Sequence, residues 1–158
     1  MRFVPRAVRE KDGRFRLELP REEREVLRTL PAQLREMLAE EGDPALRRLF
    51  PPAYADDPER EAEFREMVRD ELLEGKLAAI ATMEATIDAE RLTEDELLAW
   101  LGALNDLRLV LGTRLDVTEE TGFEDFEGDR REGMAALYWY LGALEEDVVE
   151  ALEARSGL

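Results

Sequence analysis

The chain has 158 residues, of which 44% are hydrophobic and 39% are charged, and its formal net charge is −17. It contains no cysteine and no histidine, which excludes disulfides, thiolate nucleophiles and iron–sulfur clusters and removes the commonest general base and zinc ligand. Ser156 is the only serine, so a Ser–His–Asp site cannot be built, and the negative charge disfavours direct DNA binding, which depends mainly on Lys and Arg.

The length predicts one domain, because a chain of this size can bury roughly 70% of the surface that its unfolded form exposes. We expect a mainly α-helical protein, a helical bundle of four to five helices with an N-terminal β-hairpin. The single helical domain spans 1–158, with the hairpin arm at 1–19 and the bundle at 20–155. The start lacks a hydrophobic signal core, and no apolar run reaches the ~20 residues that cross a bilayer. We therefore expect a cytoplasmic protein without membrane contact.

Residues 3–19 are predicted to form the hairpin, with a two-residue turn at Asp12-Gly13. Phe15, Leu17 and Leu19 alternate with polar residues, which gives one face to bury. A lone hairpin is marginal in water, so it must pack on the helices or pair with another chain. Residues 2–16 hold six basic and two acidic side chains. They are expected to contact either a phosphate or acidic partner, or the protein's own carboxylates. The second reading is favoured because surface charge runs are usually solvated or self-compensating.

The first helix is expected from Pro20 to about Glu41, with a kink at Pro31, where one backbone hydrogen bond is lost. Asp43-Pro44 then opens a short helix, Ala45 to Leu49. The predicted core positions of the first helix follow a helical period: Val26, Leu27, Leu30, Leu34, Met37 and Leu38.

An irregular segment follows at 47–54, Arg47-Arg48-Leu49-Phe50-Pro51-Pro52-Ala53-Tyr54, whose apolar residues are expected to anchor a loop; a binding role is the alternative. Asp57-Pro58 caps a long third helix, predicted to reach about Ala89. Its many carboxylates predict a strongly negative, solvated side. Its predicted core positions are Phe64, Met67, Val68, Leu72, Leu73, Leu77, Ile80 and Ile87.

The central helix is predicted over Thr93 to Leu115, and Thr93 with Glu96 satisfies the capping-box pattern. Leucines recur along one side at intervals of three and four. Four polar residues interrupt or follow this pattern: Asn105, Asp106, Arg108 and Arg114. A partly buried arginine requires a carboxylate partner, which the acidic loop at 116–132 or the third helix is expected to supply. We favour a structural polar cluster over a partner or ligand site, because Arg stays protonated and Asn does not titrate usefully.

The acidic loop lacks the spacing of a calcium-binding loop, so no metal and no cofactor are expected. The last helix is predicted from about Asp129 to Ala154, and Tyr138, Trp139 and Tyr140 leave it in directions about 100° apart. At least one of the three should therefore lie under the hairpin or at a subunit contact, such as that of a homodimer. Intramolecular packing is the favoured reading, although such aromatics are enriched in binding hot spots.

Three stretches resemble the actinobacterial AosR-like family, long described as a domain of unknown function and commonly encoded beside the proteolytic adaptor ClpS. They are the segment 47–54, the run from Trp100 through Asn105-Asp106-Leu107-Arg108 to Leu115, and Leu137-Tyr138-Trp139-Tyr140-Leu141. The resemblance implies a non-enzymatic cytoplasmic regulator of the oxidative stress response that contacts an alternative sigma factor. Because the chain has no cysteine, a thiol–disulfide switch is excluded.

We expect the contact surface to combine the basic hairpin, the acidic third helix and the side chains of Arg47, Arg48, Tyr54, Tyr138, Trp139 and Tyr140. The alternatives are a regulator of ClpS or Clp proteolysis, which rests on the gene neighbourhood of the family, and a small-ligand-binding helical domain that uses the polar residues of the central helix.

Overall fold

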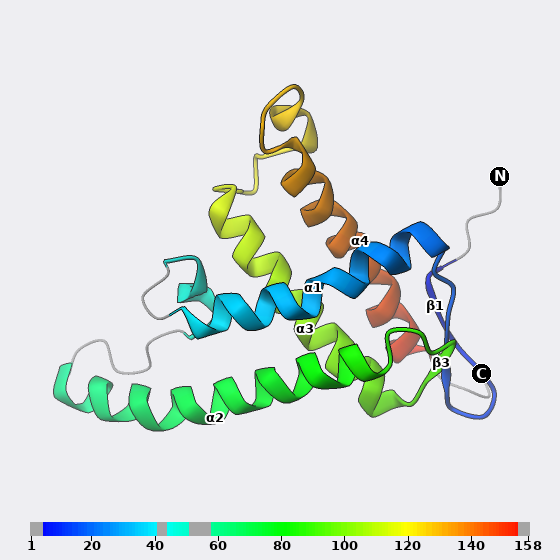
Figure 1. Ribbon diagram of the computed structural model, residues 1–158, viewed down its shortest axis with the longest axis horizontal. Coiled ribbons are helices and arrows are strands. Elements are labelled where there is room, and N and C mark those ends of the chain that lie inside the picture. Colours follow the sequence, from blue (N-terminus) through cyan, green and yellow to red (C-terminus); the bar gives the residue numbers. More distant parts are fainter. Residues whose placement is uncertain (1–4, 41–43, 51–57, 155–158) are drawn as a thin grey trace.

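The computed structural model describes residues 5–40, 44–50 and 58–154, with the backbone alone at 44, 45, 47, 58, 61, 64 and 65. It confirms a mainly helical fold with an N-terminal β-hairpin (Figure 1). None of the helices in these ranges is long and apolar enough to cross a membrane. The elements in chain order are β1 (Ala7–Arg9), β2 (Phe15–Leu17), α1 (Arg21–Ala39), the 3-10 helix η1 (Pro44–Leu49), α2 (Pro58–Ala85), β3 (Arg91–Leu92), α3 (Glu94–Arg114), the 3-10 helix η2 (Phe123–Phe126) and α4 (Glu132–Glu153).

The hairpin is part of a three-stranded antiparallel sheet in the order β1-β2-β3. The predicted two-residue turn is wrong: the Glu10 amide donates to the Arg14 carbonyl at 2.7 Å, which leaves a three-residue loop. A two-residue type I′ turn needs positive φ at both central residues, and only Gly13 has it, at 86°. The sheet packs on α4 through β1, and the short strand β3, which the sequence pattern did not predict, covers β2.

α1 continues through Pro31, which is buried and does not divide the helix. Four of the predicted core leucines are buried here, but Val26 is 46% exposed. The helical periodicity predicted Val26 to be a core residue. Val26 is exposed because α1 packs mainly on α2 in the structure. Val26 instead lines an open apolar groove between α1 and α4.

The central position of α3 is confirmed, since it packs on both α2 and α4. The capping box at its start has both predicted bonds: the Glu96 amide donates to the Thr93 hydroxyl at 3.2 Å, and the Thr93 amide donates to the Glu96 carboxylate at 2.8 Å. Trp100 is fully buried, and its indole N–H donates to Thr86 Oγ1 at 2.7 Å. This bond joins the end of α2 to the middle of the core.

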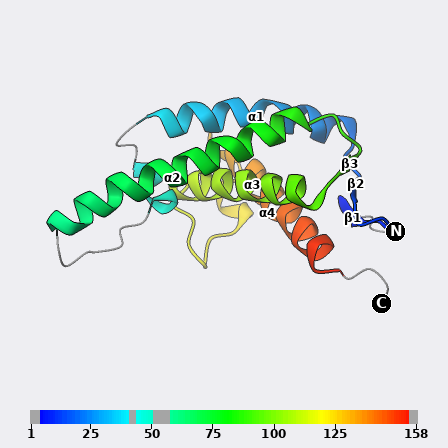
Figure 2. The same ribbon diagram turned by 90° about the horizontal axis from the view of Figure 1, so that it is seen from below.

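α2 ends at Ala85, earlier than predicted, and only its second half is buried in the core, through Ile80 and Met83. The predicted core positions Met67 and Leu72 are 65% and 40% exposed. Figures 1 and 2 show the reason, because the first half of α2 extends beyond the ends of α1 and α3. No helix of the described chain covers that outer side.

Candidate functional site

Asp106 on α3 is almost completely buried, at 7% exposed. Lys76 of α2 donates from Nζ to both of its carboxylate oxygens, at 3.0 and 3.1 Å. Burial raises the pKa of Asp106, and the opposing charge of Lys76 limits this rise. Lys76 and Asp106 therefore form a buried ion pair between α2 and α3. α2 is the third helix of the sequence prediction, and it supplies the cation of this pair.

Arg108 faces the other neighbour of α3. Its Nε lies 3.6 Å from Oε1 of Glu145 on α4, which is an ion pair but too long for a hydrogen bond. Burial raises the pKa of Glu145, and Arg108 opposes this rise. The expectation that the acidic loop or the third helix supplies the partner of Arg108 is wrong, because α4 lies against this side of α3.

The four predicted polar residues are thus not brought together. Asp106 contacts α2 and Arg108 contacts α4, while Asn105 is half-buried and Arg114 is exposed at the end of the helix. None of them lines the apolar groove at Val26 or the cavity described below. This arrangement is that of ion pairs that fix the position of α3 between its neighbours.

The three adjacent aromatics also face three different neighbours. Trp139 packs against Phe123 and Phe126 of η2, with ring centroids 6.0 and 6.1 Å apart. Tyr138 lies over the backbone of α3, and the guanidinium of Arg6 stacks 5.2 Å from the centroid of Tyr140, which places Tyr140 beside the hairpin. Each of the three is half-buried. Of the remaining predicted surface residues, Arg48 is exposed, the side chain of Arg47 is not described, and Tyr54 lies outside the described residues.

Three arginines of the hairpin, Arg6, Arg9 and Arg16, are paired with the protein's own carboxylates. Arg6 Nε lies 2.6 Å from Glu23, and its Nη1 lies 3.6 Å from Asp147. Arg9 lies 3.7 Å from Glu94 on α3. These contacts agree with the internal reading for Arg6 and Arg9, whereas Lys11 and Arg14 are exposed and form no ion pair with the residues that the structure describes.

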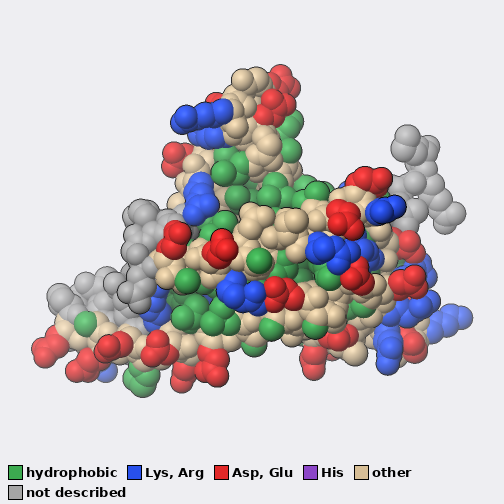
Figure 3. Space-filling view, viewed as in Figure 1, with side chains coloured by type: hydrophobic (Ala, Val, Ile, Leu, Met, Phe, Trp, Pro, Cys, Tyr) green, Lys and Arg blue, Asp and Glu red, His purple; other side chains and the backbone are tan. Residues whose placement is uncertain are grey.

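The outer side of α2 is the part of the predicted contact surface that remains open. Met67 is 65% exposed and has carboxylates four residues before and after it, at Glu63 and Glu71. Two basic residues of α2 point inward instead: the Arg69 guanidinium lies 4.4 Å from the Phe50 ring centroid, and Lys76 binds Asp106. Figure 3 shows acidic side chains gathered along this edge with hydrophobic ones among them. We call this surface the α2 face; it comprises Glu63, Glu66, Met67, Asp70, Glu71 and Glu74.

None of the carboxylates of the α2 face forms an ion pair with any residue that the structure describes. The spacing of these residues at three, four and seven places them on one side of the helix. The sequence pattern contained a signal for this exposure, since an apolar residue with carboxylates at i−4 and i+4 has charged neighbours on its own side. The prediction followed the apolar periodicity instead and placed Met67 in the core.

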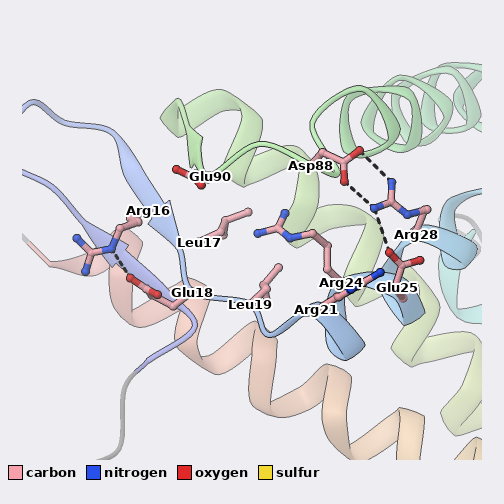
Figure 4. A pocket seen from close by; sticks show the side chains of 10 residues that line it. All are labelled: Arg16, Leu17, Glu18, Leu19, Arg21, Arg24, Glu25, Arg28, Asp88 and Glu90. Atoms are coloured by element: carbon pink, nitrogen blue, oxygen red, sulfur yellow. Dashed lines mark hydrogen bonds and ion pairs between the residues drawn. The ribbon is translucent and has the colours of Figure 1, made fainter.

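A cavity of about 610 Å³ lies between β2, the first two turns of α1 and the turn that precedes β3 (Figure 4). Arg28 donates to both oxygens of Asp88 at 2.9 and 2.6 Å, and this bonding lowers the pKa of Asp88. Arg24 Nη1 donates to the backbone carbonyls of Ile87 and Ala89, at 2.6 and 3.3 Å. No sequence signal indicated this cavity, because three separate segments form it.

The described residues contain no group of three or more histidine, cysteine, aspartate or glutamate side chains placed to hold a metal ion. This result concerns residues 5–40, 44–50 and 58–154, which include the whole of the acidic loop.

Comparison with known proteins gives one family and several relatives. A family model described as "Domain of unknown function (DUF2017)" matches residues 5–152. Proteins named "Oxidative stress regulator AosR" from Mycobacterium bovis and Mycobacterium tuberculosis are 33% identical over 131 residues, which is 70% of this chain and 59% of theirs. A Mycobacterium leprae relative is 30% identical over 129 residues. The chain thus spans about 59% of the length of these relatives. No solved structure matches the chain significantly.

Proposed function

The chain belongs to the DUF2017 family and resembles mycobacterial oxidative stress regulators, and from this premise we propose that it is a non-enzymatic regulatory protein that binds a basic protein partner through the α2 face. The proposed process is the oxidative stress response in the cytoplasm, and the proposed partner is an alternative sigma factor. The single observation that carries the proposal is the exposure of Met67 among unpaired carboxylates.

The physical basis is complementarity of both charge and shape. A row of unpaired carboxylates attracts a basic surface and speeds encounter with it. Met67 supplies an apolar, adaptable anchor, and methionine is common at surfaces that bind other proteins. Because the α2 face extends beyond the other helices (Figure 2), a partner can reach it without displacing the core.

The non-enzymatic part of the proposal is supported by how the polar residues are used. Asp106 and Arg108, two charged residues of the central helix, each form an ion pair with a residue of a neighbouring helix. The chain offers no cysteine or histidine for nucleophilic or acid–base chemistry. A regulator of Clp proteolysis stays the alternative, for which the gene neighbourhood of the family is the motive.

Direct binding to the purified stress sigma factor of the host tests the proposal. Met67→Ser should weaken binding about tenfold, as expected for loss of a hot-spot side chain. Glu63→Lys with Glu71→Lys should weaken it at least as much and reduce its salt dependence. The control reverses the same number of exposed carboxylates on another helix, Glu146→Lys with Glu150→Lys on α4, and should leave the affinity within about twofold.

Equal binding by the α2 variants and the wild type would overturn the role of the α2 face. If the protein binds ClpS with the same dependence on Met67 and does not bind the sigma factor, the proposed partner is wrong. The alternative role in Clp proteolysis would then be supported. Self-association that depends on Met67, measured by sedimentation, would instead assign the α2 face to a homodimer.

A further inference from the structure

The cavity between β2, α1 and the turn before β3 has the size of a small-molecule site. Its volume of about 610 Å³ lies within the range of roughly 300–1,000 Å³ that such sites occupy. Leu17, which is 5% exposed, and Leu19, which is half-buried, form an apolar wall, and charged side chains from α1 surround it (Figure 4). The lining therefore combines an apolar wall with charged side chains, as ligand sites do.

The charged groups of this cavity are not all used in the same way. Arg28 forms ion pairs with Asp88 and Glu25, and Arg16 forms an ion pair with Glu18. Arg21 and Arg24 form no ion pair with a carboxylate of any residue that the structure describes. Arg24 is held by two backbone carbonyls through Nη1 alone, so its Nε and Nη2 keep their donor capacity.

Arg21 and Arg24 lie three residues apart in the first turn of α1, which places them on the same side of the helix. The bonds from Arg24 to Ile87 and Ala89 hold its guanidinium in the position that Figure 4 shows, directed toward the cavity beside Leu17. A guanidinium fixed in this way loses little freedom when it binds an anion. Arg24 is thus a positioned cation beside Leu17, and Arg21 adds a second positive charge from the same side of the helix.

The charge balance of the lining decides which anion fits. Four carboxylates, Glu18, Glu25, Asp88 and Glu90, line the cavity together with four arginines, so the lining favours a singly charged anion over a phosphate or another multiply charged anion. We propose that this cavity binds a small organic monocarboxylate, with its carboxylate between Arg21 and Arg24 and its hydrocarbon part on Leu17 and Leu19. This site is independent of the contact proposed for the α2 face.

Hexanoate is the probe, with inorganic phosphate and hexan-1-ol as comparisons, and binding is followed on the full chain by amide and methyl NMR shifts. Hexanoate should shift the signals of Leu17 and Leu19 in a saturable way. The alcohol lacks the charge and phosphate lacks the hydrocarbon part, so each should bind at least about tenfold more weakly.

Arg21→Gln is the informative variant, because Arg21 is exposed and its removal breaks no ion pair with the described residues. It should weaken hexanoate binding about tenfold, the loss expected for one charge-assisted contact. Arg14→Gln, an exposed arginine of the hairpin loop outside the cavity, is the matched control and should have no effect. No saturable shift with hexanoate, equal binding of phosphate, or equal loss in both variants would overturn the proposal.

Discussion

Lys76→Met tests whether the buried ion pair between α2 and α3 holds the fold together. Lys76 Nζ lies 3.0 and 3.1 Å from the two oxygens of Asp106, a residue that is 7% exposed. Removing the ammonium group leaves a carboxylate inside the protein without its cation. Breaking one side of a buried pair typically costs about 3–5 kcal/mol. Because the Lys76 side chain keeps 19% exposure, we expect about 3 kcal/mol at pH 7, the lower end of that range.

The pH dependence gives the same prediction a second, more specific outcome. Burial raises the pKa of Asp106 above its unfolded value of about 3.9. The folded protein therefore holds this proton more tightly than the unfolded chain does. The associated stability is fully present below the unfolded pKa and is lost as the pH rises through the folded pKa. Lys76→Met removes the charge that limits the rise, so the pKa of Asp106 increases further and the deficit of the variant shrinks on acidification.

Urea unfolding at pH 7 and near pH 5 measures both effects, with Asp106→Asn and the double variant completing a cycle. The asparagine carries no charge, so the double variant should recover most of the loss and its stability relative to Asp106→Asn should be independent of pH in this range. A loss under about 1 kcal/mol at pH 7, together with an unchanged deficit near pH 5, would show that the pair behaves as a solvated surface contact and would refute this reasoning.

Substitutions at four further positions test the core and the central helix by urea or thermal unfolding. Thr86→Val leaves the buried indole N–H of Trp100 without its acceptor and should cost about 1–3 kcal/mol, whereas serine at the same position should retain the bond. Gly102→Ala, where a methyl group meets nothing within 4 Å, should stabilise α3 by about 0.5–1 kcal/mol, and Gly112→Ala should not, because its Cβ would lie 3.1 Å from an aromatic ring carbon of α4. Thr93→Ala should cost about 1 kcal/mol by removing the helix cap, and an equal stability of the alanine and serine variants would contradict the capping role.

The start of α3 illustrates what a local pattern predicts well. The capping box depends on atoms only three residues apart, so Thr93 and Glu96 were sufficient to locate it, and both bonds are present. The hairpin arginines were likewise expected against internal carboxylates, and Arg6 and Arg9 are paired in this way. The turn was less well predicted, because a two-residue and a three-residue loop use the same glycine and differ in the register of the strands.

Contacts between distant segments explain the predictions that were wrong. Arg108 was expected to pair with a carboxylate, but no local pattern in the sequence identified Glu145 of α4 as its partner. The strand β3 has only two residues and pairs because β2 lies beside it. The cavity at Arg21 and Arg24 has no sequence signal at all, since β2, α1 and the turn after α2 must first be placed together.

The amino-acid sequence alone determined the helical class, the ends of most helices and the absence of cysteine and histidine chemistry, because these follow from composition and from contacts within one turn. Tertiary structure alone decided which apolar positions are covered. Val26 and Met67 have the periodicity of core residues and are 46% and 65% exposed. The physical reason is that a helical period specifies the direction of a side chain, whereas burial requires another element to lie in that direction.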